Sequence, residues 1–141
     1  ELLERGGRLL PCDDRIVEVD GYQLVTSSSS GPTEWELVRE MDDHQLHQKL
    51  LELCSGIGDP DFAIFNLQSD SKAVQRIVKR FQPVVRFRGS MQGNGGGVSR
   101  QGRTLELSPR APMVEDAAPT LYGVLVQIER GEVKDYVFTE A

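Results

Sequence analysis

A short strand is predicted at residues 15–20, where apolar and polar side chains alternate up to Gly21. A period of two is typical of a strand with one buried face, and residues 22–25 are expected to form the returning strand. The serine tract that follows, residues 27–32, is small, polar and closed by Gly-Pro. This composition predicts a flexible surface loop from which no chemistry is expected.

A first helix is predicted after Asp42, because apolar residues recur there at spacings of three and four. Asp42 is a suitable N-cap, with Gln45 placed to reach back to it, and Pro60 enforces the end of the segment. The apolar face comprises Leu46, Leu50, Leu51, Leu53, Cys54 and Ile57.

A second helix is predicted between a buried strand at residues 62–67 and Pro83. Asp70 or Ser71 is expected to cap it, and its basic residues lie away from its apolar stripe. That stripe comprises Val74, Ile77, Val78 and Phe81.

Further strands are predicted at residues 84–88 and 104–107. The clearest element is a C-terminal hairpin, formed by residues 121–128 and 133–138 around a turn at Arg130-Gly131. Two helices among several strands predict an α+β fold.

The composition describes an ordinary globular domain rather than a membrane span. Of the 141 residues, 38% are hydrophobic and 27% charged, and no apolar run approaches the roughly 18–20 residues that cross a bilayer. The chain begins with Glu1, so we expect it to be a piece of a longer protein. Cys12 and Cys54 have no metal-type spacing, and we expect both to be reduced, which favours a reducing compartment.

The net charge of −6 hides a basic segment without a single acid, residues 71–105. It holds half of the 16 basic residues, so an anionic partner is one alternative and docking on the chain's own acids is another. Its members are Lys72, Arg76, Lys79, Arg80, Arg86, Arg88, Arg100 and Arg103. One functional hypothesis is therefore an anion-binding accessory subunit, in which this segment binds RNA, lipid head groups or an acidic protein.

No catalytic residue, metal site or cofactor is predicted. His44 and His47 are the only histidines, and a His-x-x-His pair without further ligands is weak support for zinc. Nucleophilic catalysis needs a base, and a pairing of His47 with Cys54 has no identifiable group to orient it. The neighbouring carboxylates of residues 13–14 and 42–43 are typical of turns and caps.

The stretch Gly7-Arg-Leu-Leu-Pro-Cys-Asp-Asp-Arg-Ile-Val-Glu-Val-Asp-Gly21 resembles the Leu-x-x-Gly-Asp-x-Ile-x-x-Val-Asn-Gly motif of PDZ domains. The matching residues are Leu10, Asp14, Ile16, Val19, Asp20 and Gly21. Residues 44–51 are similar to the groove helix of that family, His-x-x-Ala-x-x-Leu-Leu, with His47 and Gln48 in place of a small and an apolar residue.

The resemblance implies a small PDZ-like β-sandwich or barrel with two helices. Residues 1–68 would form the PDZ-like segment, and residues 69–141 would add a helix and strands within the same domain. The implied partner is another protein or a peptide, which would add a strand to a sheet edge beside the groove candidates His44, His47, Gln48 and Leu51. The resulting expectation is a non-enzymatic interaction or assembly module in a larger complex, with nucleic acid and anionic lipid less favoured as partners.

Overall fold

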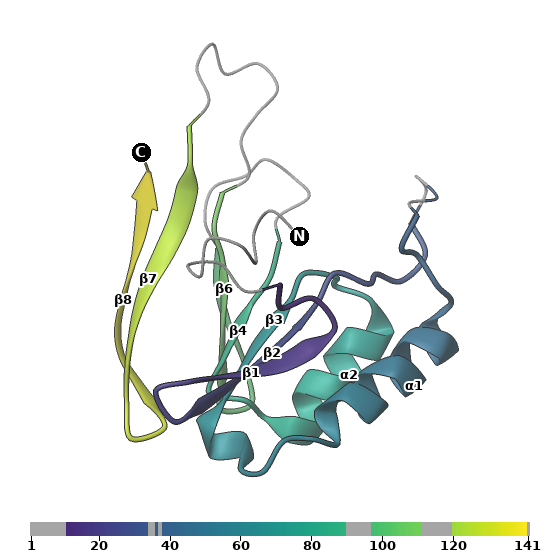
Figure 1. Cartoon of the computed structure of the whole chain (residues 1–141). Coiled ribbons are helices and arrows are strands. Elements are labelled where there is room, and N and C mark those ends of the chain that lie inside the picture. The colour runs from purple at the N-terminus through teal and green to yellow at the C-terminus, as the bar shows by residue number, and fades with distance from the viewer. Residues whose placement is uncertain (1–10, 34–35, 37, 90–96, 111–119, 141) are drawn as a thin grey trace.

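The computed structural model describes residues 11–33, 36, 38–89, 97–110 and 120–140. A six-stranded sheet lies at its centre, with two helices on one face and a separate two-stranded hairpin on the other (Figure 1). The strand order in the sheet is β1-β2-β3-β4-β6-β5. The sheet strands are β1 (Arg15–Val19), β2 (Tyr22–Ser27), β3 (Ala63–Leu67), β4 (Val85–Phe87), β5 (Gly97–Gln101) and β6 (Thr104–Ser108).

Four neighbouring strands, β2, β3, β4 and β6, run parallel. Helix α1 (Asp43–Cys54) connects β2 to β3, and helix α2 (Lys72–Phe81) connects β3 to β4, so each connection crosses over and brings the next strand back in the same direction. The edge strands β1 and β5 pair antiparallel with their neighbours. The carboxyl ends of the four parallel strands therefore meet at one edge of the sheet.

Both helices begin where the sequence predicts. The backbone N–H of Gln45 donates to the Asp42 carboxylate at 2.8 Å, and the Gln45 side chain accepts from the Asp42 N–H, which forms a capping box. Ser71 caps α2 by accepting from the N–H of Val74. A short 3-10 helix, η2 (Pro60–Phe62), precedes β3.

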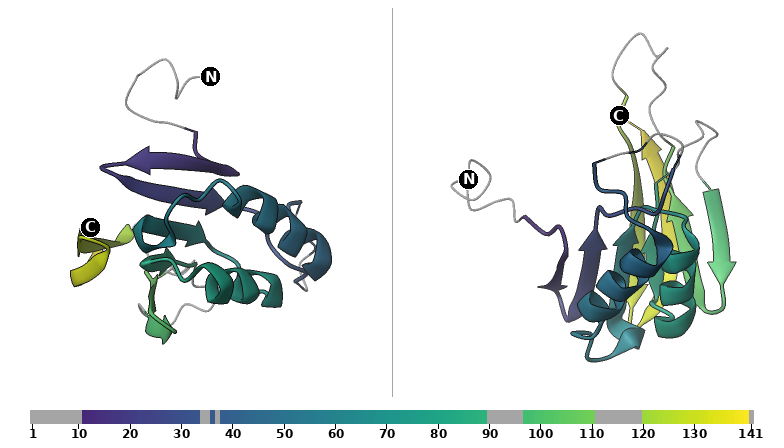
Figure 2. Two further views of the ribbon diagram at one scale, coloured as in Figure 1. Left: turned by 90° about the horizontal axis from the view of Figure 1, so that it is seen from below. Right: turned by 90° about the vertical axis from the view of Figure 1, so that its right-hand side faces the viewer.

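Figure 2 shows the layers from two further sides, with the helices and the hairpin on opposite sides of the sheet. Two apolar clusters hold these layers together. The first lies between the helices and the sheet and is centred on Leu46, Leu50, Phe65, Val74 and Ile77. The second lies between the sheet and the hairpin, β7 (Tyr122–Glu129) and β8 (Glu132–Glu140), and comprises Val84, Val85, Leu105, Leu107, Tyr22, Ile64, Phe87, Val124, Val126, Ile128, Val133 and Phe138. The hairpin thus covers the face that the helices leave open.

The predicted α+β class, the two helices and the C-terminal hairpin are confirmed. The direction of the inner strands was not predicted: the main sheet is open, with edges at β1 and β5, rather than closed into a barrel. Strands from both sides of residue 68 pair within this one sheet. Gly7 and Leu10 of the PDZ-like stretch lie outside the described residues. Among the helices described, none is long and apolar enough to cross a membrane.

Candidate functional site: a crevice at the carboxyl ends of the parallel strands

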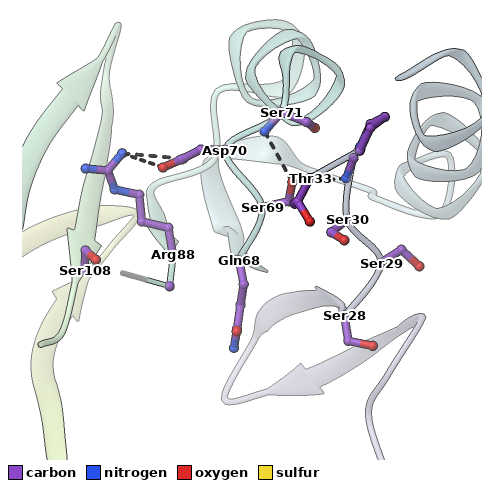
Figure 3. A pocket seen from close by; sticks show the side chains of 13 residues that line it. Ser28, Ser29, Ser30, Thr33, Gln68, Ser69, Asp70, Ser71, Arg88 and Ser108 are labelled. Atoms are coloured by element: carbon purple, nitrogen blue, oxygen red, sulfur yellow. Dashed lines mark hydrogen bonds and ion pairs between the residues drawn. The ribbon is translucent and has the colours of Figure 1, made fainter. Parts of the chain in front are cut away.

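A crevice of about 680 Å³ opens where the four parallel strands end (Figure 3). The loops that follow the parallel strands converge at this edge, where open sheets with helical crossovers commonly bind ligands, although here the strand order does not reverse and both helices lie on one face. Each of the four strands contributes residues to the lining. These are Ser28, Ser29, Ser30, Gly31, Pro32 and Thr33 after β2, Gln68, Ser69, Asp70 and Ser71 after β3, Arg88 and Gly89 after β4, and Ser108 at the end of β6. We call this site the serine crevice.

The serine tract forms one wall of the crevice and is held by two aspartates that precede β1. The Ser27 hydroxyl donates to the Asp14 carboxylate at 2.6 Å, and the N–H and hydroxyl of Ser28 both donate to Asp13 at 2.8 Å. Ser29 is buried. The tract is therefore not wholly on the surface as expected: Ser27 and Ser29 are buried, and Asp13 and Asp14 hold Ser27 and Ser28.

Two basic residues complete this network. Lys49 on α1 donates to Asp14 at 2.9 Å and to the Ser29 hydroxyl at 2.6 Å. Arg39 bridges both aspartates and lies 2.6 Å from Asp14. Lys49 thus connects the Asp14 carboxylate to the Ser29 hydroxyl. The network positions the wall of the crevice.

The pKa values of both aspartates lie below the ordinary value. For Asp14, burial by itself raises the pKa, but hydrogen bonds from Ser27 and Lys49, together with the Lys49 charge, outweigh burial and lower it. For Asp13, burial is likewise outweighed, here by the side-chain and backbone hydrogen bonds from Ser28. Both carboxylates are thus held in the ionised form that the serine tract requires.

Ser69 joins the serine tract to the start of α2. Its hydroxyl accepts from the N–H of Gly31 at 3.3 Å and from that of Ser71 at 3.2 Å (Figure 3). Gly31 packs so closely that an added Cβ would lie 2.6 Å from the Ser71 Cβ, so only glycine fits. Asp43, at the start of α1, accepts from the N–H of Ala73, and the first turn of α2 is therefore already partnered.

Arg86 forms the floor beneath the crevice and is almost completely buried. Its guanidinium donates to Glu106 on β6 at 2.6 Å, to the Leu67 carbonyl at 3.1 Å and to the Ser69 carbonyl at 2.5 Å. A buried ion pair of this kind needs all of these partners to offset the loss of hydration. Arg86 consequently fixes the ends of β3, β4 and β6 relative to one another.

Arg88 reaches into the crevice from the end of β4. Its side chain is half-buried, and its Nη1 lies 3.3 Å from an Asp70 carboxylate oxygen (Figure 3). The Nε of Arg88 is buried, and no described residue accepts a hydrogen bond from it. An unsatisfied buried donor of a charged group is costly, so the Nε of Arg88 reduces the stability of this region. The exposed part of the side chain is what a ligand in the crevice could contact.

The residues proposed from the PDZ resemblance lie on α1 and outside the crevice. His44 and Gln48 are exposed, and His47 is half-buried. Leu51 packs against the cluster between the helices and the sheet. The structure thus places these four residues on one helix, and none of them lines the serine crevice.

The basic segment does not form one surface. Lys72, Arg76, Lys79 and Arg80 are exposed on α2, as the helical stripe predicts. Arg86 is buried and Arg88 lies in the crevice. Arg100 and Arg103 lie at the β5–β6 turn, at the opposite end of the sheet. Alternation along β4 places Arg86 on the face opposite Val85 and Phe87, and no local signal shows that this face is also covered.

The crevice serines were missed by sequence reasoning, although each group directly follows a predicted strand.

The parts of the chain that the structure describes contain no group of three or more His, Cys, Asp or Glu side chains that could hold a metal ion. Comparison with protein-family models, with curated proteins and with solved structures finds no match to this chain.

Proposed function

We propose that the protein is a non-enzymatic binding domain whose ligand occupies the serine crevice. The ligand is a small, hydroxyl-rich molecule, a sugar or a sugar acid, that presents an acceptor oxygen to Arg88. The observation that carries the proposal is the half-buried guanidinium of Arg88, which lines the crevice together with hydroxyl and amide side chains from the ends of four strands.

The chemistry of the lining supports this class of ligand. Hydroxyl groups both donate and accept, and the side chains of Ser30, Thr33 and Ser108 and the amide of Gln68 surround the space with such groups. The two charged residues, Arg88 and Asp70, pair with each other, so the lining carries no large excess of charge. A volume of about 680 Å³ suits a small molecule, since ligand pockets are typically about 300–1,000 Å³.

Saturation-transfer NMR tests the proposal with glucose, gluconate, ribose and glycerol as probes. We expect at least one of the three larger compounds to bind the wild-type protein. Arg88→Gln, which removes the guanidinium, should weaken that binding about tenfold or more, because a hydrogen bond to a charged group contributes about 1.5–3 kcal/mol. Arg80→Gln, on the exposed face of α2, is the matched control and should leave it unchanged. Failure of all probes, or equal loss in both variants, would contradict the proposal.

A second candidate is addition of a partner peptide to β1, in the mode that the PDZ resemblance implies. Among the described residues β1 pairs only with β2, Ile16 on it packs against the cluster beneath α1, and Val19 is 51% exposed. Main-chain hydrogen bonds to such an edge persist at high salt. A pull-down with the protein at about 0.1 M and about 0.5 M salt tests this mode. A partner that is retained at both salt concentrations, and that the Val19→Lys variant no longer retains, supports it. A partner that is lost at the higher salt concentration contradicts it.

A further inference from the structure

A second pocket, of about 620 Å³, lies between the tip of the C-terminal hairpin and the sheet. Three arginines from separate segments line it: Arg100 on β5, Arg103 in the β5–β6 turn and Arg130 in the β7–β8 turn. The rest of the lining comprises Asp61, Phe62, Val84, Gly131, Glu132 and Val133. We call this site the arginine pocket.

The walls of the arginine pocket are held in place by hydrogen bonds. The Gly131 N–H donates to the Tyr22 hydroxyl at 3.0 Å, and Gly131 lies so close to Asp61 that an added Cβ would be 2.9 Å from its carbonyl oxygen. Across the pocket, the N–H of Arg103 donates to the Gln82 side chain at 2.9 Å, and its Nε donates to the Gln82 carbonyl at 2.8 Å. The hairpin tip and the β5–β6 turn are therefore anchored to the sheet before any ligand arrives.

Two guanidinium groups of the pocket have no ion-pair partner among the described residues. Arg103 pairs with Asp61, and Glu132 pairs with Lys134 at 2.8 Å. In the part of the chain that the structure describes, neither Arg100 nor Arg130 forms an ion pair, and Arg100 makes only a 3.5 Å hydrogen bond to the Arg103 carbonyl. Both acids of the lining are thus already neutralised, which leaves a positive pocket in a protein with a net charge of −6.

The backbone at Arg130 adds a second observation. Arg130 and Gly131 form a two-residue hairpin turn with positive φ at both positions, +51° and +76°. Such turns favour Asn, Asp or Gly at the first position, as the β1–β2 turn illustrates with Asp20-Gly21. An arginine with positive φ is unfavourable for the turn itself, so its presence at the mouth of a pocket points to its side chain.

We propose that the arginine pocket binds a small-molecule phosphate monoester. The phosphate lies between Arg100 and Arg130, because guanidinium groups form paired hydrogen bonds with phosphate oxygens and remain charged at any physiological pH. The organic part rests on the apolar side of the lining, formed by Phe62, Val84 and Val133. The volume exceeds what phosphate alone would fill.

The two proposed sites are independent. Val84, which lines the arginine pocket, directly precedes β4, and Arg88, which lines the serine crevice, directly follows it. The sites therefore lie at opposite ends of the same strand, and substitutions in one do not touch the other.

Isothermal titration with AMP, adenosine and inorganic phosphate tests the proposal at about 0.15 M ionic strength, where the Debye length is about 8 Å. We expect AMP to bind most tightly, inorganic phosphate more weakly, and adenosine not to bind over the same concentration range. Arg100→Gln with Arg130→Gln should weaken AMP binding about tenfold or more. The control is the double variant Arg76→Gln with Arg80→Gln, which removes the same charge from the exposed face of α2. It should change the affinity for AMP less than about twofold, since exposed distant charges are largely screened.

The outcomes separate this proposal from its alternatives. Equal losses in the two double variants would show a diffuse charge effect and overturn the site. Absence of AMP binding, or equal affinities for AMP and inorganic phosphate, would overturn the assignment to a phosphate monoester. Arg88→Gln should leave AMP binding unchanged; a loss in that variant would place AMP in the serine crevice and overturn the arginine pocket.

Discussion

The guanidinium of Arg86 and the carboxylate of Glu106 lie 2.6 Å apart inside the sheet, on the neighbouring parallel strands β4 and β6. The exposed fractions of their side chains are 1% and 9%. Arg86 also donates to the carbonyl of Leu67, the last residue of β3, and to the carbonyl of Ser69 just after it. This ion pair therefore connects three of the four strands that carry the serine crevice. The crevice thus rests on a buried charge that only a complete set of partners can stabilise.

Removing one member of this pair should cost more than replacing both. Glu106→Leu leaves the buried guanidinium with only the exposed carboxylate of Asp70, 3.1 Å away, and should lower the free energy of unfolding by about 3–5 kcal/mol. Arg86→Met combined with Glu106→Leu should recover a large part of that loss. Urea unfolding measures both effects, with Glu132→Gln in the exposed hairpin pair as a control that should change nothing measurable. A double variant less stable than Glu106→Leu alone would contradict this account.

The aspartates that hold the serine tract predict a specific loss of stability in acid. The pKa of Asp14 is lower in the folded protein than its ordinary value of 3.8, so its ionised form contributes stability above about pH 4 that is lost as the pH falls through the folded pKa. Asp14→Asn should remove that part of the pH dependence, and asparagine tolerates the positive φ of 54° at this position. Urea midpoints between pH 6 and pH 2 measure the effect.

The matched control for this pH dependence is Asp135→Asn on the exposed face of the hairpin, which should keep the wild-type acid loss. If Asp14→Asn lost as much stability between pH 4 and pH 2 as the wild type, the Asp14 carboxylate would not hold the tract in the way described.

Gly31→Ala should displace the serine tract from the start of α2. The added Cβ would lie 2.6 Å from the Ser71 Cβ, which is inside contact distance, and we expect a loss of about 1–3 kcal/mol in the free energy of unfolding. Gly58→Ala is the control, because its Cβ would meet nothing closer than 3.8 Å. Equal stabilities of the two variants would show that the tract does not pack against α2.

The two cysteines should differ strongly in reactivity. Burial raises the pKa of the Cys54 thiol to about 12, whereas Cys12 is only partly buried. Because the thiolate is the reactive form, a disulfide reagent at pH 8 should modify Cys12 in the folded protein and Cys54 only on unfolding. Cys12→Ser should abolish the fast reaction. Rapid labelling of Cys54 in the native protein would contradict its position in the core.

The sequence predicted what depends on local patterns. The capped start of α1 at Asp42, the stripe of α2 and the turn at Arg130-Gly131 are each encoded within a few residues, and each is found in the structure. The inward orientation of Arg86 was not predicted, because its partner Glu106 is 20 residues away in the sequence. Basic residues were therefore grouped by sequence position, although the fold distributes them among a helix face, a buried floor and two pockets.

The serine tract is a second case in which the local sequence does not reveal the contacts made in the fold. Its composition is that of a flexible loop. Contacts with Asp13, Asp14 and Lys49 order the tract, and local propensity does not reveal these contacts. The crevice itself depends on the parallel arrangement of the strands, since only that arrangement brings Ser28, Ser69 and Arg88 to one edge. Strand direction follows from the crossover helices rather than from any single residue.

The most direct test of the account follows the ¹H–¹⁵N signal of the Arg88 Nε–H during titration with the tightest-binding sugar or sugar acid of the probe set. The account predicts a shift of this signal that saturates with the ligand, while the Arg80 signal stays in place. Saturable binding that leaves the Arg88 signal unmoved would show that the ligand binds elsewhere and would contradict the assignment of the serine crevice as the binding site.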